Sequence, residues 1–312
     1  MLTRAFKLFT GSGNAWRPHL RAAMFMYQRG LNQNPEYFGM EDKPMTYEHL
    51  PISEEEAADA EQVATFRLLS GTLIWLDILS AITSGTAPFL LSYHPSVLTS
   101  SSPIKLGDIM GSRNWIMLQI GRISALHEHK MQALDQGQFD STYFDQTVEH
   151  ISRDIQSGLT HEALDGFNIS DSDPAATFCA GSIDTVSDPV SLITHSFVYM
   201  ATFYLHLVNH GFQNLETQEG IISAAMRMLQ TQISVHLLPA LVAPLFVIGS
   251  VAKNQDEQFF RGIFSSPPLS DASLKHRERI LPILEEVWTR RRTAPRFSWN
   301  DCLELTSETL LL

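Results

Sequence analysis

The chain has 312 residues, of which 44% are hydrophobic, and a formal net charge of −12 from 22 basic and 34 acidic side chains. This composition supports a sizeable hydrophobic core and argues against wholesale disorder. A protein that binds duplex nucleic acid directly needs clustered Lys and Arg, so the acidic balance argues against such binding. The length suits one large domain or two ordinary ones.

The cysteine content is low, with only Cys179 and Cys302 in the whole chain. Two cysteines exclude both a disulfide framework and a structural zinc site with four cysteine ligands. They indicate free thiols in a reducing compartment, so we expect an intracellular protein, nuclear or cytoplasmic. The first residues are too polar and their apolar part too short for a signal peptide.

One apolar stretch, residues 233–251, has the length of a membrane span. It contains His236, Pro239 and Pro244, and it follows other segments that are equally apolar. A buried helix of a bundle explains this pattern better than a membrane-spanning helix, so no membrane association is expected.

The periodicity of apolar residues predicts helices along the whole chain and no strands. Loops are expected over 32–50 and 83–105, and residues 158–185 show little periodicity. No sustained heptads and no solenoid repeat occur, so the fold is predicted to be all-α, a single compact multi-helix domain. The predicted helices cover residues 2–10, 16–27, 53–82, 115–136, 144–156, 190–209, 216–236, 239–251, 259–263 and 274–291.

Two of these helices, over residues 66–82 and 115–136, are apolar on almost every face and are expected at the centre of the fold. Asp77 lies within the first and Arg122 within the second. A buried unpaired charge is very costly, so Asp77 is predicted to pair with Arg122 or with Arg113. Arg113 precedes the positive end of a helix and needs an acid, Asp77 or Asp108, unless it contacts a ligand.

A stripe of polar and aromatic side chains on residues 190–209 is the best candidate for a binding site. Such a face can line a pocket for an aromatic small molecule. The alternative is an ordinary core whose polar groups are hydrogen-bonded, and base rates favour it. The stripe comprises His195, Tyr199, Thr202, Phe203 and His206, and Asp77, Arg113 and Arg122 are the expected ligand-binding residues beside it.

Other candidates for chemistry are weak. His206 and His210 share a helix face, but the sequence shows no third metal ligand, and no phosphate loop or dinucleotide motif occurs. His127 and His129 lie too far apart around a helix to share a metal. No metal and no cofactor are therefore predicted. The basic run at residues 290–292 follows Trp288 near a helix end, where cations are favourable for local reasons.

Several segments together resemble the fungal-specific transcription factor domain, the helical regulatory region found in zinc-binuclear-cluster transcription factors. They are AWRPHLRAA, WLDILSAITSGTAPFL, MGSRNWIMLQIGRISALHEHK, APLFVIGSVAKNQDEQFFRGIF and ILEEVWTRRRTAPRFSWNDCLEL, in the order of the family. The resemblance implies one regulatory domain over residues 1–312. The six clustered cysteines of the family's DNA-binding module do not occur, and the part that normally precedes AWRPHLRAA is short, so the domain is expected to be truncated at its N-terminus.

Two functions fit these observations. The first is a regulatory domain without its own DNA-binding module, tied to fungal secondary metabolism, which binds a small-molecule effector, a protein partner or a second copy of itself. The second is an enzyme on the same fold that isomerises or cyclises a small biosynthetic substrate by acid–base chemistry. In the second case His195, His206 and Tyr199 are the expected catalytic residues.

Overall fold

The computed structural model describes residues 16–33, 54–166, 188–271, 275–306 and 309–311. Within these ranges every regular element is a helix and no strand occurs, which confirms the all-α prediction. The predicted helix over residues 2–10 and most of the predicted loop over 32–50 lie outside the described residues.

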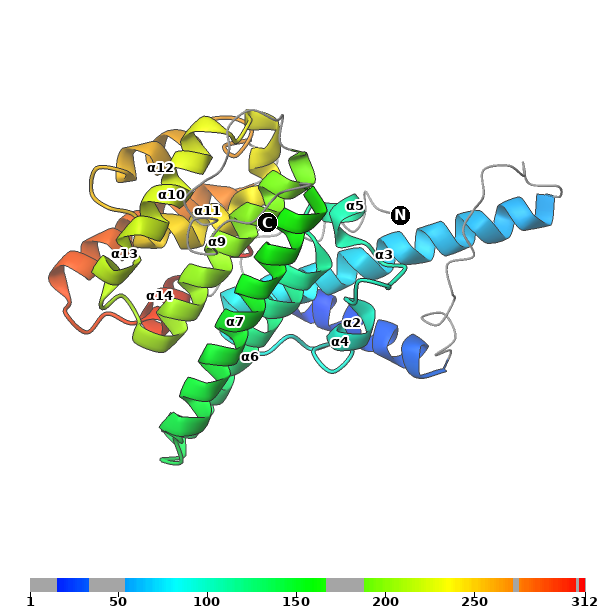
Figure 1. The fold of residues 1–312 in the computed structure, drawn as a ribbon, viewed down its shortest axis with the longest axis horizontal. Helices are drawn as coiled ribbons and strands as arrows, with labels where there is room; N and C mark the ends of the chain where they lie inside the picture. The colour runs from blue at the N-terminus through cyan, green and yellow to red at the C-terminus, as the bar shows by residue number, and fades with distance from the viewer. Residues whose placement is uncertain (1–15, 34–53, 167–187, 272–274, 307–308, 312) are drawn as a thin grey trace.

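The first half of the fold is built on long helices. The predicted helices over 53–82 and 115–136 are present with slightly different ends, and the helix predicted over 16–27 continues to Gln33. α3 extends well beyond the body of the molecule at its N-terminal end (Figure 1). The elements are α2 (Trp16–Gln33), α3 (Glu54–Ser84), α4 (His94–Val97), α5 (Leu106–Met110), α6 (Asn114–Asp135) and α7 (Ser141–Gly166).

The prediction that α3 is buried on almost every face is correct only for its second half. Ile78 and Ile82 are fully buried, whereas Leu68 and Leu69 are 41% and 48% exposed. The difference arises because the first half of the helix reaches past the helices that could cover it (Figure 1). Periodicity shows which residues are apolar, but it does not show where the neighbouring elements end.

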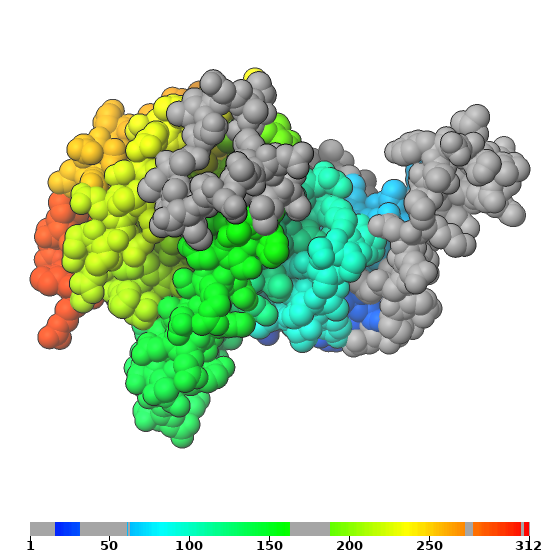
Figure 2. Space-filling view, in the orientation of Figure 1, coloured from blue at the N-terminus to red at the C-terminus, as the bar shows by residue number. Residues whose placement is uncertain are grey.

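α7 is longer than its predicted extent of 144–156, and its last turns fall in a segment expected to lack periodicity. Asp140 caps the start of the helix, because its carboxylate accepts hydrogen bonds from the backbone N–H groups of Thr142 and Tyr143 at 2.9 and 3.1 Å. Gly158 lies against the indole ring of Trp115 on α6, so the extra turns are stabilised by tertiary packing. The connected ends of α6 and α7 project from the body (Figure 2).

The second half of the fold consists of shorter helices around α9. One prediction is wrong here, since residues 216–236 do not form a single helix. α10 ends at Thr231, and a 3₁₀ helix that contains Pro239 leads into α11. Proline has no N–H to donate and disfavours α conformation in the residue before it. The elements are α9 (Pro189–His210), η3 (Leu215–Gln218), α10 (Glu219–Thr231), η4 (Val235–Leu241), α11 (Val242–Val251), α12 (Glu257–Phe264), η5 (Lys275–Arg279), α13 (Ile280–Thr293) and α14 (Trp299–Thr306).

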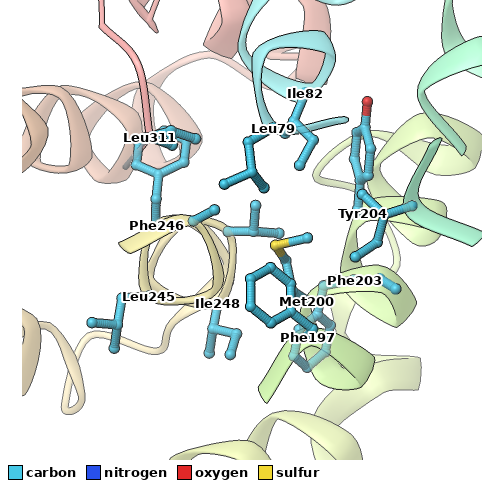
Figure 3. Packing of buried hydrophobic residues seen from close by; sticks show 14 of the residues in the cluster. Leu79, Ile82, Phe197, Met200, Phe203, Tyr204, Leu245, Phe246, Ile248 and Leu311 are labelled. Atoms are coloured by element: carbon cyan, nitrogen blue, oxygen red, sulfur yellow. The ribbon is translucent and has the colours of Figure 1, made fainter. Parts of the chain in front are cut away.

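The centre of the core is formed by α6, α9 and α11, together with the second half of α3. All 10 residues of α11 are buried. α9 packs on both α6 and α11, while the second half of α3 covers one side. Side chains from α3, α9 and α11 meet in one cluster, and Leu311 from the C-terminal end of the chain joins it (Figure 3). A single continuous core confirms the prediction of one compact domain.

Two helical segments, residues 63–84 and 189–210, are long and apolar enough to cross a bilayer by length and composition. The first is 50% buried inside the fold and the second 61% buried. Both segments take part in the core described above, which accounts for their apolar composition.

Candidate functional site

Asp77 is buried in the second half of α3, with 2% of its side chain exposed. Its carboxylate accepts the backbone N–H groups of Phe89 and Leu90, each at 2.8 Å. His94 Nε2 lies 3.3 Å from Oδ2, at ion-pair distance, although the angle is not that of a hydrogen bond. Asp77 therefore fixes the start of the segment that links α3 to α6.

The predicted pairing of Asp77 with Arg113 or Arg122 is therefore wrong. The physical reason is that hydrogen bonds from backbone N–H groups can stabilise a buried carboxylate without a cation, since each N–H is a strong donor. The predicted long linker over 83–105 supplies these donors, and it contains α4 and the buried His94.

Arg113 pairs with Glu162 near the end of α7. Arg113 Nε lies 2.9 Å from Glu162 Oε1, and the side chains are 41% and 6% exposed. The backbone N–H of Arg113 donates to Thr194 Oγ1 on α9 at 3.2 Å. Arg113 thus has the acidic partner that its place before a helix requires, but that acid is neither Asp77 nor Asp108.

Arg122 pairs with Asp154 of α7, with Nη1 lying 2.7 Å from Oδ2. The two side chains are 37% and 31% exposed. Such a half-exposed ion pair joins α6 to α7 but contributes little to stability. The structure therefore separates the predicted ligand-binding residues Asp77, Arg113 and Arg122 into three different contacts.

The polar stripe on α9 is held largely by local hydrogen bonds. His195 Nδ1 lies 2.8 Å from Ser191 O, and Thr202 Oγ1 donates to Val198 O at 3.0 Å. Bonds of this kind, to the carbonyl one turn earlier, are typical of polar residues within helices. Tyr199 is partly buried and Phe203 is fully buried.

His206 lies near the end of α9 and is buried. Its Nε2 lies 2.9 Å from the carbonyl oxygen of Gln213, and its ring is 5.1 Å from that of His210. Burial lowers the pKa of His206, and the neighbouring His210 lowers it further. His206 is therefore favoured in its neutral form, with Nε2–H donating to the Gln213 carbonyl.

His127 also has a structural contact, since Nδ1 lies 3.2 Å from the carbonyl oxygen of Gly85. Burial lowers its pKa as well. In the part of the chain that the structure describes, no three His, Cys, Asp or Glu side chains come together as a metal site.

The basic side chains at the end of α13 contact carboxylate and carbonyl oxygens of the same domain. Arg290 pairs with Glu286, and Arg292 Nη1 pairs with Glu257 at 2.5 Å. Arg291 Nη1 donates to the carbonyl oxygens of Ser250 and Ala252 at 2.6 and 3.1 Å. These contacts confirm the local role that the sequence predicts for the run.

Comparison with known proteins decides the family. The family described as "Fungal specific transcription factor domain" matches residues 1–312. The chain belongs to this family. Transcription regulators act inside the cell and in the nucleus, which agrees with the intracellular location expected from the cysteines. No solved structure matches this fungal specific transcription factor domain.

Three curated relatives carry regulator names. "Pestheic acid cluster transcriptional regulator 3" of Pestalotiopsis fici is 38% identical over 98% of the chain and 54% of its own length. "Trichothecene biosynthesis transcription regulator TRI10" of Fusarium sporotrichioides is 25% identical over 93% of the chain and 66% of its own length. "Transcription factor dibT" of Pestalotiopsis microspora is 26% identical over 91% of the chain and 48% of its own length.

The domain spans about half to two thirds of the length of these relatives. Since the relatives are regulators, the enzyme alternative gains no support from the comparisons.

Three partners of the predicted residues were missed in the sequence. His94 lies in a segment expected to be loop, and Glu162 lies in one expected to lack periodicity. Asp154 lies within a predicted helix but offers no signal that it faces Arg122. Asp154 and Glu162 lie eight residues apart on α7, which is about two helical turns. This spacing is the one signal in the sequence that both face the same neighbour, α6.

Proposed function

We propose that this domain is the regulatory part of a transcription regulator that controls a secondary-metabolite biosynthetic gene cluster. The observation that carries the proposal is the 38% identity, over 98% of the chain, with a protein named as a pestheic acid cluster regulator. The names of two further relatives, a trichothecene biosynthesis regulator and a transcription factor, support the same role.

In this proposal the domain acts without touching DNA itself. The net charge of −12 is unfavourable beside a phosphate backbone. Arg290, Arg291 and Arg292, the basic residues most concentrated in the sequence, already bind carboxylate or carbonyl oxygens of the same domain. The regulator would therefore reach its promoters through another module or a protein partner, in the nucleus.

The proposal includes a signal that the domain receives. A small-molecule effector is the signal we favour, with a protein partner or a second copy of the chain as alternatives. The candidate residues for an effector site are the α9 stripe of His195, Tyr199, Thr202 and His206, together with Arg113 on the neighbouring α6 side. Asp77 and Arg122 already have protein partners, Asp77 in the linker after α3 and Arg122 on α7.

A tethering experiment tests the proposal. Residues 1–312 are fused to a heterologous DNA-binding domain in a fungal host that carries a reporter gene with the matching operator. We expect reporter transcription to change relative to the DNA-binding domain alone. An equally expressed fusion that leaves the reporter at the level of the DNA-binding domain alone would count against a regulatory role.

A further inference from the structure

The outward face of α2 is apolar and basic. Phe25 and Met26 are 60% and 74% exposed. Arg21 and Arg29 are exposed as well, one helical turn before and one turn after Phe25, so these three side chains share one face of the helix. α2 contains no Asp or Glu, and among the described residues neither arginine has an ion-pair partner. We call Arg21, Phe25, Met26 and Arg29 the α2 face.

The connected ends of α6 and α7 form a second surface that is apolar and acidic. Leu134 and Tyr143 are 49% and 54% exposed. Asp135 and Asp145 are also exposed, and neither has an ion-pair partner in the part of the chain that the structure describes. Lys130, the one Lys or Arg between residues 128 and 149, donates to carbonyl oxygens at the end of α9. We call Leu134, Asp135, Tyr143 and Asp145 the α6–α7 tip.

The backbone of the α6–α7 tip is fixed by its turn. Gly137 has a φ of +66°, in the left-handed region that favours glycine. The N–H groups of Gly137 and Gln138 donate to carbonyl groups of the last turn of α6 at 3.1 and 2.8 Å. The rings of Phe139 and Phe144 lie 5.4 Å apart and hold the connection against α7. An ordered surface loses little conformational entropy when it binds, which favours docking.

The two surfaces belong to elements on the same side of the molecule. The connected ends of α6 and α7 project from the body, and α2 lies along the side of the body toward which they project (Figure 1). A two-fold axis on this side would bring the projecting tip of each copy to the α2 of the other. Such an arrangement repeats the same contact twice and closes on itself, so it ends at a dimer.

We propose that the α6–α7 tip of one copy docks on the α2 face of a second copy, and that the two contacts form a two-fold symmetric dimer. The carboxylates of the tip pair with the arginines of the α2 face, and the apolar side chains of the two surfaces cover one another. Stable interfaces bury roughly 1,200–2,000 Å² in total, which two reciprocal contacts reach more readily than one. The dimer is independent of the regulatory role proposed above.

The charges favour a second copy over other partners. The α2 face is basic although the chain has a net charge of −12, and the tip of another copy supplies the acids that α2 lacks. A nucleic acid could bind the arginines, but the acidic tip beside them would repel it. The net charge opposes association at long range, so we expect a dissociation constant on the order of micromolar.

Light scattering coupled to gel filtration tests the dimer on the full chain. At about 50 μM, a dimer of micromolar affinity is well populated. We expect a mass close to twice the 35.0 kDa of one chain.

Reversal of charge on either surface should break the dimer. Arg21→Glu with Arg29→Glu makes the α2 face acidic opposite an acidic tip. Asp135→Arg with Asp145→Arg makes the tip basic opposite a basic α2 face. Like charges placed opposite each other should weaken association on the order of a hundredfold or more, so each doubly substituted protein should be a monomer.

A mixture of these two proteins gives the sharpest result. In the mixed dimer an acidic α2 face meets a basic tip at one contact, and a basic α2 face meets an acidic tip at the other. We therefore expect two monomeric proteins to form a dimer when mixed. The control is Arg227→Glu with Arg296→Glu, which changes the net charge as much as the α2 reversal does, at exposed residues elsewhere. The control should remain a dimer.

A second measurement needs no charge reversal. The photoreactive amino acid benzoylphenylalanine replaces Met26, whose side chain is exposed, and should cross-link to residues 134–145 of another copy. Mixing isotopically light and heavy chains distinguishes links between copies from links within one chain. Circular dichroism confirms that each substituted protein is folded.

Four results would overturn the proposal. They are a monomeric unmodified chain at about 50 μM, a folded charge-reversed protein that is still a dimer, a mixture of the two folded reversed proteins that stays monomeric, and cross-links between copies that miss the tip. A monomeric control would also count against it, because net charge and not the two surfaces would then decide association. If a reversed protein does not fold, the cross-link decides alone. None of these outcomes changes the expected reporter result, and an inert reporter would leave the dimer untouched.

Discussion

Asp77 illustrates how a single acidic residue organises a segment that lacks regular structure. Its carboxylate holds the backbone N–H groups of Phe89 and Leu90 and lies beside His94, all of which belong to the link between α3 and α6. The sequence indicates that Asp77 needs a partner, because it interrupts an apolar run. It does not indicate that the partners are backbone groups, since those leave no trace in the choice of residue.

Asp77→Ala should destabilise the domain by about 3–5 kcal/mol, because the backbone N–H groups of Phe89 and Leu90 lose their acceptor. The control is Asp154→Ala, which breaks the half-exposed pair with Arg122 and should cost at most about 1 kcal/mol. Urea denaturation followed by circular dichroism measures both. Equal shifts of the two midpoints would contradict the structural role given to Asp77.

His206 should make stability depend on pH. Burial lowers its pKa in the folded state below the ordinary value, so the unfolded state binds a proton more readily. The stabilising contribution is therefore complete above about pH 6.5, the unfolded value, and is lost as the pH falls from there through the folded pKa.

The variant His206→Gln keeps a donor for the Gln213 carbonyl but does not titrate. We expect the unfolding free energy of the unmodified domain to fall more steeply than that of this variant between about pH 7 and pH 5. Urea denaturation over that range compares the two slopes. Parallel slopes would mean that the buried neutral histidine does not contribute to the pH dependence.

At the scale of elements, the crossing of α6 and α7 depends on the absence of a side chain at Gly158. A Cβ there would lie 2.4 Å from the ring of Trp115. The sequence does not reveal this contact, because a glycine within an amphipathic helix is equally consistent with weak helical propensity. The periodicity also misses the end of α7, because the turns after residue 156 are stabilised by this contact between helices.

Gly158→Ala should destabilise the domain by about 1–3 kcal/mol, because the new methyl group forces the two helices apart. Gly220→Ala in α10 is the control, since no atom lies within 4 Å of the position of its Cβ. That change should stabilise by up to about 1 kcal/mol through helix propensity. Thermal melting measures both, and a Gly158→Ala protein as stable as Gly220→Ala would contradict the packing described.

Arg291 joins α13 to the end of α11 by donating to the carbonyl groups of Ser250 and Ala252. Burial lowers its pKa to about 10, so it remains a cation at neutral pH. These carbonyl groups lie at the C-terminal end of α11, where a helix has no further N–H donors of its own.

Arg291→Met should cost about 2–3 kcal/mol, because two carbonyl groups lose a charged donor. Arg290→Met removes only an exposed pair with Glu286 one turn away and should cost at most about 0.5 kcal/mol. Chemical denaturation distinguishes the two. If both changes had the same small effect, Arg291 would not be the structural link between α11 and α13.

At the scale of the whole molecule, the sequence predicts the fold class and most helices, since long amphipathic runs produce strong periodic signals. The predicted ends of α3, α6 and α9 lie within a few residues of the observed ones. The start of α2 is also correct, but the helix continues to Gln33. Two of the predictions that fail concern what a helix faces. The outward reach of α3 and the pairing of Asp77 depend on neighbours distant in the chain. The break before α11 is local and lies at Pro239.

The candidate site was even less predictable. Arg113 is singled out because a cation before a helix is unfavourable, but its partner Glu162 lies in a segment without a periodic signal. The α9 stripe is equally compatible with a pocket and with a core, and its local hydrogen bonds are those that helices of either kind contain. Residue types alone do not distinguish a satisfied polar group from one that awaits a ligand.

Control of one biosynthetic gene cluster, the function proposed from the names of the relatives, can be tested directly. The most direct measurement is the transcript profile of the fungus that carries the gene, with and without the gene. We predict that the transcripts of one clustered set of biosynthetic genes change markedly in level. Unchanged transcripts of every biosynthetic cluster, under conditions in which the gene is expressed, would contradict the claim.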